Sequence, residues 1–434
     1  MKMMKRILNL IYSTNYIRFG NVVQDCFESL KFYIYRLEYS FEDYEQRKIQ
    51  WSYQTFRRTI WLTLNSWINI FYIVHLAFFP NYFLWKSLKS FERAFQFERV
   101  DFLLQYQITV FIILEYIWFK FFKKILSYNY PFNNLMQRYA YYFDDNKLKS
   151  EYRQYLTRFI HTGNFISKTL NMMMTILIII FGIFGIPILI LLFINNEITF
   201  ISLISHLLLL TNLLIRSIYL IGQLFDTLTY LLFFIELVKL QIKQITLCLQ
   251  SKIRCYRFNQ LICRQFMKKY GQIIHDVFII DQAMSLVFFG IETISKSAII
   301  YCTIFYSKQI EMNLFNTSIC IFFLSTCIYS NGIYSHASQL PHYNRLGCLL
   351  LMKWLARKQY QRYNKNRSIR SIRSIRSISV RNEIRINLFK QTMSENHLGF
   401  NCGQIFSIIK YKFVEIFLMN FQLIILFYKK IIMK

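Results

Sequence analysis

The stretch that decides the fold runs from Met172 to Ile194 and has the sequence MMMTILIIIFGIFGIPILILLFI. It contains no charged residue, and it is longer than the roughly 20 apolar residues that a helix needs to cross the hydrocarbon core of a bilayer. A connection of only a few residues, Asn195–Ile198, leads from it into a second apolar stretch, Thr199–Ile221. Together these two stretches predict a tight hairpin of membrane-spanning helices.

Five further stretches of similar length and composition flank this hairpin. They are Thr59–Phe79, Phe102–Phe122, Met284–Tyr306, Leu314–Tyr334 and Gln404–Tyr428. The bulk composition agrees, because 55% of the residues are hydrophobic, whereas about 45–50% is usual in soluble domains. The sequence therefore predicts an all-α membrane protein with seven transmembrane helices.

Lysine and arginine are concentrated in alternate connections between these stretches. The N-terminal segment and every second connection after it carry 39 of these residues, whereas the other connections and the C-terminal tail carry 8. Because Lys and Arg are retained on the cytoplasmic side, this asymmetry predicts a cytoplasmic N-terminus and an extracellular C-terminus. That orientation is the reverse of a G-protein-coupled receptor. The net charge of +29 has the same explanation, because the basic residues are spread over four cytoplasmic segments, which could also contact anionic lipids of the bilayer. No nucleic-acid partner is therefore expected.

The connections divide the chain into four parts. The expected parts are a cytoplasmic N-terminal segment (1–58), the first six transmembrane helices with cytoplasmic helical extensions (59–337), a cytoplasmic loop with a basic repeat and a helix (338–403), and the last transmembrane helix with a short tail (404–434). Within the third part, Arg367–Ile378 repeats Arg-Ser-Ile. A period of three drifts around a helix, so this repeat is expected to be a mobile basic linker.

Helical periodicity also extends beyond the predicted spans. Apolar residues continue at spacings of three and four from the fourth span to Leu249, and Leu261–Ile280 and Arg381–Gly399 have a helical pattern as well. We expect these extensions to pack together in the cytoplasm and to hold subunits together. Amphipathic helices on the membrane surface are the alternative.

The sequence contains no catalytic constellation, glycine-rich phosphate loop or metal-ligand motif, so neither an enzyme nor a cofactor is expected. Ionisable residues inside the predicted spans are more informative, because their burial in a bilayer is costly. Glu292 and Lys296 are four residues apart and are expected to pair along one helix face. Glu115 and Arg216 lie toward cytoplasmic helix ends, where they could extend to the interface. Neutralisation within the protein is the other interpretation, and for each of these residues it is favoured over a proton relay.

The last predicted span has two competing polar stripes. Glu415 and Gln422, separated by apolar residues, form one, and Asn420 and Phe427 mark the other. Four copies of such a helix around an axis would form a path with acidic and amide rings that favour cations and apolar rings that gate by dewetting. Ordinary helix packing is the alternative interpretation of the same pattern.

The C-terminal region resembles the insect gustatory receptors, a branch of the insect chemoreceptor superfamily. That family has Thr-Tyr-x5-Gln-Phe in its last span, after a segment similar to Cys-Gly-x-Phe. This chain has Cys402-Gly403-Gln404-Ile405-Phe406 and then Asn420-Phe421-x5-Phe427-Tyr428, so the spacing is kept while most identities differ.

The resemblance implies a chemosensory (taste) receptor subunit in the plasma membrane that acts as a ligand-gated cation channel. It implies a homo- or hetero-tetramer with related subunits and a small-molecule tastant as ligand. For the pore lining, the alignment with the family favours Asn420, Phe427 and Tyr428, whereas electrostatics favours Glu415 and Gln422. Because Phe427 stands where the family has Gln, a non-conducting relative is an alternative, and a secondary transporter is another.

Ligand-binding candidates follow from the predicted topology. Aromatic and hydrogen-bonding side chains in the outer halves of the spans are suited to small organic ligands. They are Tyr106 and Gln107 in the second span, His206 in the fourth and Tyr301 in the fifth. Each could also have a packing or lipid-facing role.

Overall fold

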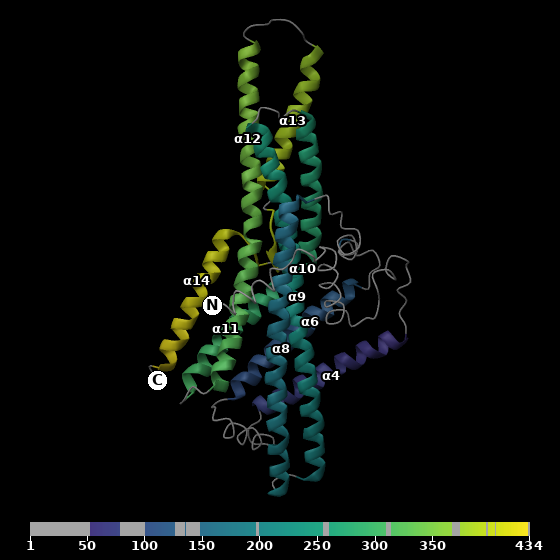
Figure 1. Cartoon of the computed structure of the whole chain (residues 1–434), viewed down its shortest axis with the longest axis vertical. Coiled ribbons are helices and arrows are strands. Elements are labelled where there is room, and N and C mark those ends of the chain that lie inside the picture. The colour runs from purple at the N-terminus through teal and green to yellow at the C-terminus, as the bar shows by residue number, and fades with distance from the viewer. Residues whose placement is uncertain are drawn as a thin grey trace.

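The computed structural model describes residues 53–78, 100–125, 135, 148–196, 199–254, 260–309, 314–366, 374–395, 398–403 and 405–432. Within these ranges the chain consists of long helices and one small β-hairpin (Figure 1). In chain order the elements are α4 (Tyr53–Phe78), α6 (Val100–Ile125), α8 (Ser150–Ile194), α9 (Phe200–Arg254), α10 (Gln260–Lys308), α11 (Leu314–Ala337), α12 (Gln339–Asn366), α13 (Ser374–Glu395), β1 (Asn401–Cys402), β2 (Phe406–Ser407) and α14 (Lys410–Ile432).

Each of the first six predicted spans lies almost entirely within a single helix, from α4 to α11. Four described segments are long and apolar enough to cross a membrane, and a shorter apolar segment, Leu103–Ile117, lies in α6. The four are Ser150–Ile194, Leu203–Gly222, Leu261–Lys308 and Thr317–Arg357. The structure thus fits an all-α membrane protein. The number of seven spans and the orientation of the termini stay predictions.

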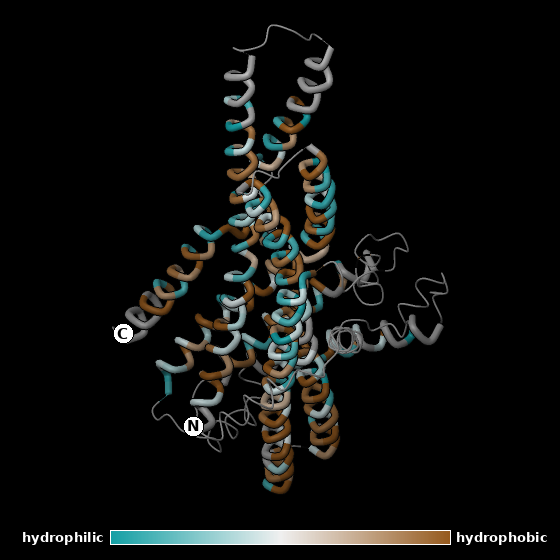
Figure 2. The backbone as a smooth tube through the Cα atoms, turned by 45° about the horizontal axis from the view of Figure 1, so that its top comes forward, coloured by the Kyte–Doolittle hydropathy of each residue, from teal (hydrophilic) through white to brown (hydrophobic). Residues whose placement is uncertain are grey.

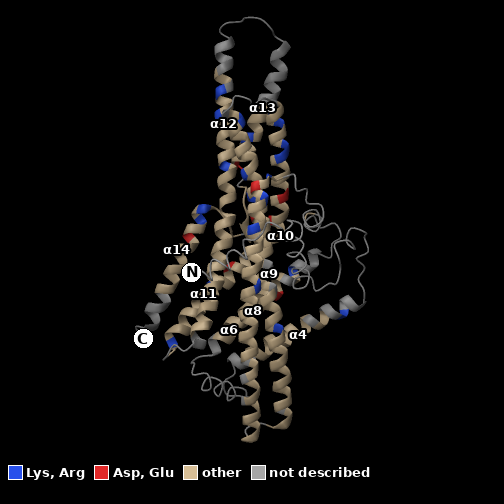
Figure 3. Ribbon diagram, in the orientation of Figure 1, with Lys and Arg blue, Asp and Glu red and all other residues tan. Residues whose placement is uncertain are grey.

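Helices α8 and α9 form the predicted hairpin. Helix α8 ends at Ile194, and the turn that follows contains Asn196 in the left-handed region, with a φ of 57°. Asparagine tolerates this conformation better than most residues do. Figure 2 shows that the most apolar parts of both helices lie together at this end, and Figure 3 shows Lys and Arg gathered toward the opposite end, along α9, α12 and α13.

Helix α9 is longer than any bilayer requires. Its 55 residues extend about 80 Å at about 1.5 Å per residue, whereas the hydrocarbon core is about 30 Å thick. The apolar positions that predicted this extension, from Leu231 to Leu249, are buried except for the half-buried Ile245. The helix therefore continues beyond the membrane because its apolar face is covered by other helices. The third span also continues beyond its predicted limit, N-terminally to Ser150 within α8, an extension that the sequence did not indicate.

The extensions of α9, α10 and α13 meet on α12, as the sequence predicts. The ring of Phe389 on α13 lies 5.4 Å from that of Tyr270 on α10, centroid to centroid. A Cβ placed on Gly347 of α12 would lie 3.5 Å from both Met393 of α13 and Thr246 of α9. The four helices are thus in direct contact. Whether this layer joins subunits stays a prediction.

The segment between α13 and α14 differs from the prediction. The last span was expected to begin at Gln404, directly after a helix, but β1 and β2 pair as an antiparallel hairpin and α14 begins at Lys410. We call the described residues just before α14, 398–403 and 405–409, the strap. Gly403 has a φ of 60°, a left-handed conformation that interrupts any helix here. Helix α13 also begins at Ser374, so the end of the Arg-Ser-Ile repeat is helical and not a linker; residues 367–373 lie outside the described part.

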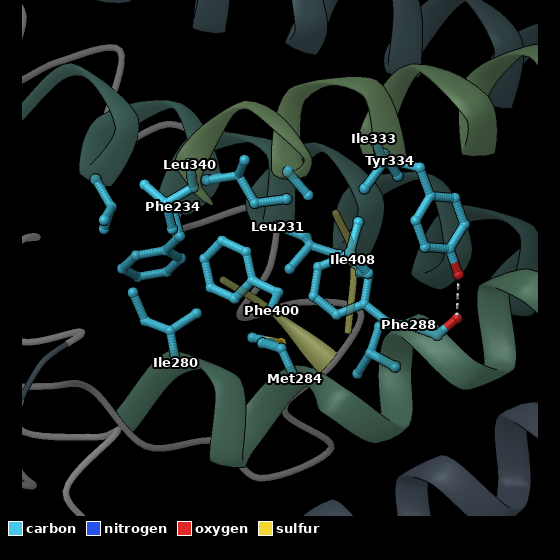
Figure 4. Packing of buried hydrophobic residues seen from close by; sticks show 14 of the residues in the cluster. Leu231, Phe234, Ile280, Met284, Phe288, Ile333, Tyr334, Leu340, Phe400 and Ile408 are labelled. Atoms are coloured by element: carbon cyan, nitrogen blue, oxygen red, sulfur yellow. Dashed lines mark hydrogen bonds between the residues drawn. The ribbon is translucent and has the colours of Figure 1, made fainter. Parts of the chain in front are cut away.

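The strap inserts its apolar side chains into the main hydrophobic core. Phe400 is fully buried among Leu231 and Phe234 of α9 and Ile280 and Met284 of α10 (Figure 4). Close by, the hydroxyl of Tyr334 on α11 donates a hydrogen bond of 3.0 Å to the carbonyl oxygen of Phe288. The core thus joins the start of the last helix to three long helices.

Candidate functional site

Three aromatic side chains from three helices form a cluster, which we call the outer aromatic cluster after the half of the spans in which the predicted topology places it. Tyr106 of α6 makes edge-to-face contacts with Tyr301 of α10 and Phe323 of α11, at centroid distances of 5.8 and 4.8 Å. Such pairs contribute about 0.5–1.5 kcal/mol beyond the area they bury. Tyr106 is buried, whereas Tyr301 is only partly covered. Two of the four predicted ligand-binding residues thus lie side by side.

The other two predicted ligand-binding residues contact different partners. The amide of Gln107 donates a hydrogen bond of 2.8 Å to the hydroxyl of Ser217 on α9. The ring of His206, also on α9, lies edge-on to Tyr72 of α4 at 6.5 Å. Gln107 therefore joins α6 to α9 beside the outer aromatic cluster, and His206 belongs to the α4–α9 interface.

A buried ion pair joins α4, α6 and α9. The guanidinium of Arg216 on α9 pairs with the carboxylate of Glu115 on α6, and its Nε donates to the hydroxyl of Ser66 on α4 at 2.7 Å. That hydroxyl donates in turn to the Glu115 carboxylate at 2.7 Å. Of the two interpretations that the sequence left open for Arg216 and Glu115, extension to the interface and neutralisation within the protein, this contact agrees with the second. Both side chains are buried, and in an apolar bundle each charge is less costly beside the other.

Asparagine side chains extend this polar contact along α4. The amides of Asn65 and Asn212 bond to each other in both directions, at 2.7 and 2.6 Å. Asn212 also donates to the carbonyl of Asn69, one turn further along α4, at 3.3 Å. Polar contacts at positions 65, 66 and 69 thus fix α4 against α9.

The two polar stripes of the last span lie on different faces of α14. Asn420 is buried, together with Ile416, on the face that packs against α10 and α11. Gln422 is exposed, and the neighbours on its face are exposed as well: Tyr411, Leu418 and Ile425. Helix α14 includes Phe427 and Tyr428, but the structure does not describe their side chains.

The predicted acidic residue of the last span is partly neutralised. The carboxylate of Glu415 lies 2.8 Å from the ammonium of Lys412, and both side chains are about one-third exposed, at 38% and 35%. The predicted pair of Glu292 and Lys296 on α10 is confirmed, with 3.2 Å between the charged atoms.

Sequence reasoning missed Phe323, Ser66 and Ser217. Serine and phenylalanine are ordinary residues in apolar spans, so composition alone does not mark them. The signal that was available is Asn65, Asn69 and Asn212. Amides inside transmembrane helices hydrogen-bond across helix interfaces, and these three indicate that α4 and α9 are neighbours.

No protein-family model and no curated protein matches the chain. Among solved structures, the chain is similar to the insect olfactory receptor OR5 from Machilis hrabei, which was solved in complex with eugenol. The superposition has a TM-score of 0.54 at 10% sequence identity and covers 95% of this chain and 97% of the receptor chain. At this identity the likeness establishes the fold alone. The chain therefore has the fold of an insect olfactory receptor.

Proposed function

We propose that the chain is a chemosensory receptor subunit that acts as a ligand-gated cation channel in the plasma membrane. Four identical or related copies would surround a central path. Two findings support this function: the fold similarity to an olfactory receptor solved with a small aromatic ligand, and the resemblance of the last span to the gustatory receptors. The second favours a tastant as the ligand.

The observation that carries the proposal is the exposed Gln422 on α14. It lies twelve residues after Lys410, about 18 Å along the helix, and its neighbours on the exposed face, Leu418 and Ile425, are apolar. An amide exposed to hydrocarbon costs about 4–8 kcal/mol, so this face requires water or other protein beside it. A ring of four α14 helices around a water-filled path supplies both.

The residues of this exposed face are suited to conduction. Glu415 at the start of α14 would form an acidic ring that attracts cations, and Gln422 would form an amide ring. Between and beyond them, Leu418 and Ile425 would form apolar rings that close by dewetting. Asn420 packs within its own subunit, which ranks the Glu415–Gln422 stripe above the Asn420–Phe427 stripe as the lining of the path.

Conduction is tested by voltage clamp of cells that express the chain alone and with related subunits, with eugenol as the first probe. Glu415→Gln should lower cation conductance, and Gln422→Leu should lower it further, because the path would lose its polar rings. A higher conductance in Phe427→Gln would instead favour the Asn420–Phe427 stripe as the lining. Ile416→Val, on the packed face, is the matched control and should leave the cation selectivity unchanged. Currents unaffected by the first two variants would contradict the proposed path, and no current in any combination would indicate a non-conducting relative.

The ligand would bind at the outer aromatic cluster. Tyr106 and Tyr301 supply aromatic walls, and Gln107 next to Tyr106 supplies a hydrogen-bonding group. Tyr106→Ala and Tyr301→Ala should each weaken eugenol binding to the purified protein, measured by calorimetry. Phe389→Leu, at the contact of α13 with α10, should not weaken it. Binding unchanged in both tyrosine variants would remove the cluster from the ligand site.

A further inference from the structure

The strap is attached to helix α10 by polar contacts. The backbone N–H of Asn401 donates to one carboxylate oxygen of Asp281 at 2.6 Å, and the side-chain amide of Asn401 donates to the other oxygen at 2.7 Å. The N–H of Gly403 donates to the carbonyl oxygen of Ser285 at 2.8 Å, one turn along α10. Both strands of the hairpin are involved, because the hydroxyl of Ser407 donates to the Asn401 carbonyl at 2.6 Å.

The apolar side of the strap reinforces this attachment. Its buried side chains are Leu398, Phe400, Cys402 and Ile408, each less than 5% exposed. The N–H of Ile408 donates to the carbonyl oxygen of Phe400 at 2.8 Å, which closes the hairpin immediately before α14. A hydrogen bond thus connects Asn401 to Ser407, three residues before Lys410, the first residue of α14.

Helix α10 joins this attachment to the outer aromatic cluster. It runs without interruption and without proline from Gln260 to Lys308. Asp281 and Tyr301 lie twenty residues apart on it, about 30 Å at about 1.5 Å per residue. A displacement of α10 at Tyr301 therefore reaches Asp281 through a continuous helix.

We propose that Asp281 and Asn401 form a latch that fixes the start of α14 to α10, so that movement of α10 at the outer aromatic cluster reaches α14. The donor pattern makes the latch specific. The Asn401 carbonyl is taken by Ser407, so its NH₂ group must face residue 281, and only an acceptor there completes the contact. The transmission of movement to a pore rests on the proposed function, whereas the latch itself does not.

The test uses the single variants Asp281→Asn and Asn401→Asp and the double variant that combines them. The first single variant places an NH₂ group against the Asn401 NH₂ group, and the second places two carboxylates together. In the double variant donor and acceptor exchange sides, and the pair is restored.

The readout is the rate at which a maleimide labels Cys402 in the purified full-length protein, resolved by peptide mass spectrometry. Cys402 is fully buried on the inner side of the strap, Cys263 is equally buried near the start of α10, and Cys248 is exposed. Each single variant should accelerate Cys402 labelling about tenfold or more, because a hydrogen bond to a charged group is lost. Cys263 should stay protected, which excludes global unfolding, and the double variant should return Cys402 to the original rate.

Equal Cys402 labelling in all variants would overturn the latch. Labelling that rises in the single variants and is not restored in the double variant would also overturn it, because the pair would then not be the cause. Eugenol-evoked currents separate the two proposals. If the protein gives no current but shows the expected labelling pattern, the latch is supported and the channel function is contradicted. If the currents do not change when the strap is released, the proposed coupling of α10 to α14 is overturned.

Discussion

Among single substitutions, one in the buried pair Arg216–Glu115 is expected to lower the stability of the protein most. Arg216→Leu should lower the stability by about 3–5 kcal/mol, because the Glu115 carboxylate stays buried without its arginine. The double variant Arg216→Leu/Glu115→Leu should recover most of this loss. The thermal unfolding midpoint of the purified protein in detergent measures both.

A matched control for this prediction lies on α10. The pair Glu292–Lys296 is more exposed, at 12% and 25%, so Lys296→Gln should cost about 1 kcal/mol or less. If Arg216→Leu and Lys296→Gln lowered the midpoint equally, the pair across α6 and α9 would not be the stabilising contact that its burial indicates.

These two ion pairs also show what sequence alone could predict at the residue scale. Glu292 and Lys296 are four apart on one helix, so the helical period places them together. Glu115 and Arg216 are 101 residues apart, and their contact depends on how α6 crosses α9. Tyr106 and Tyr301 were both singled out as lining residues, but that they touch depends on the packing of α6 against α10.

The helices and the strap differed in how well they could be predicted. The extension of α9 was predictable because buried apolar residues recur at spacings of three and four over many turns. The hairpin of the strap was not predictable, because two strands of two residues each are too short to show an alternation of apolar and polar residues. The one local signal, Gly403, was interpreted through a family motif instead of as a left-handed position.

Glycine substitutions test the strap. Gly403→Ala should destabilise the protein by about 1–2 kcal/mol, because an L side chain is strained at a φ of 60° and its Cβ would lie 3.4 Å from Phe289. Gly271→Ala is the matched control on α10, where a Cβ meets nothing within 4 Å, and it should stabilise the helix by about 0.5–1 kcal/mol. Thermal midpoints that move in the same direction for both variants would argue against the left-handed turn.

A buried carboxylate on α9 predicts a dependence of stability on pH. Glu236 is fully buried and lies beyond the fourth predicted span. Its carboxylate lies 2.5 Å from the ammonium of Lys239 and 2.8 Å from Nδ1 of His336 on α11. Tyr155 of α8 faces the carboxylate as well. Burial acts to raise the pKa of Glu236, but the hydrogen bonds and charges of His336 and Lys239 outweigh it and hold the pKa below the ordinary value of 4.5. The stabilisation is therefore complete above this value and is lost as the pH falls through the lowered pKa.

Glu236→Gln should remove this part of the acid sensitivity. The variant should be less stable near neutral pH, and its thermal midpoint should fall less steeply than that of the original protein from about pH 5 to about pH 3. Glu395→Gln, on the exposed surface of α13, serves as the control and should keep the original slope. Parallel pH profiles for Glu236→Gln and the original protein would show that the carboxylate does not stabilise the fold.

For the whole molecule, the pattern of apolar lengths was sufficient to predict an all-α membrane protein. Helices occur where apolar stretches were found, and the chain superposes over 95% of its length on a receptor with which it shares 10% identity. A fold can persist at this identity because it depends on helix lengths and buried faces, which many sequences satisfy. Positions at which helices cross depend on particular side chains, and these were the contacts that sequence reasoning missed.

Topology is the prediction that belongs to the whole chain. The charge asymmetry predicts that an epitope tag before Met1 is inaccessible to antibodies on intact cells and that a tag after Lys434 is accessible. A tag inserted between Asn195 and Asn196, in the turn of the α8–α9 hairpin, should be accessible as well, and one inserted between Arg370 and Ser371 should not. The two internal tags test the hairpin and the α12–α13 end independently of the termini. An accessible N-terminal tag together with an inaccessible hairpin tag would invert the molecule in the membrane, place the outer aromatic cluster inside the cell, and contradict a receptor for external ligands.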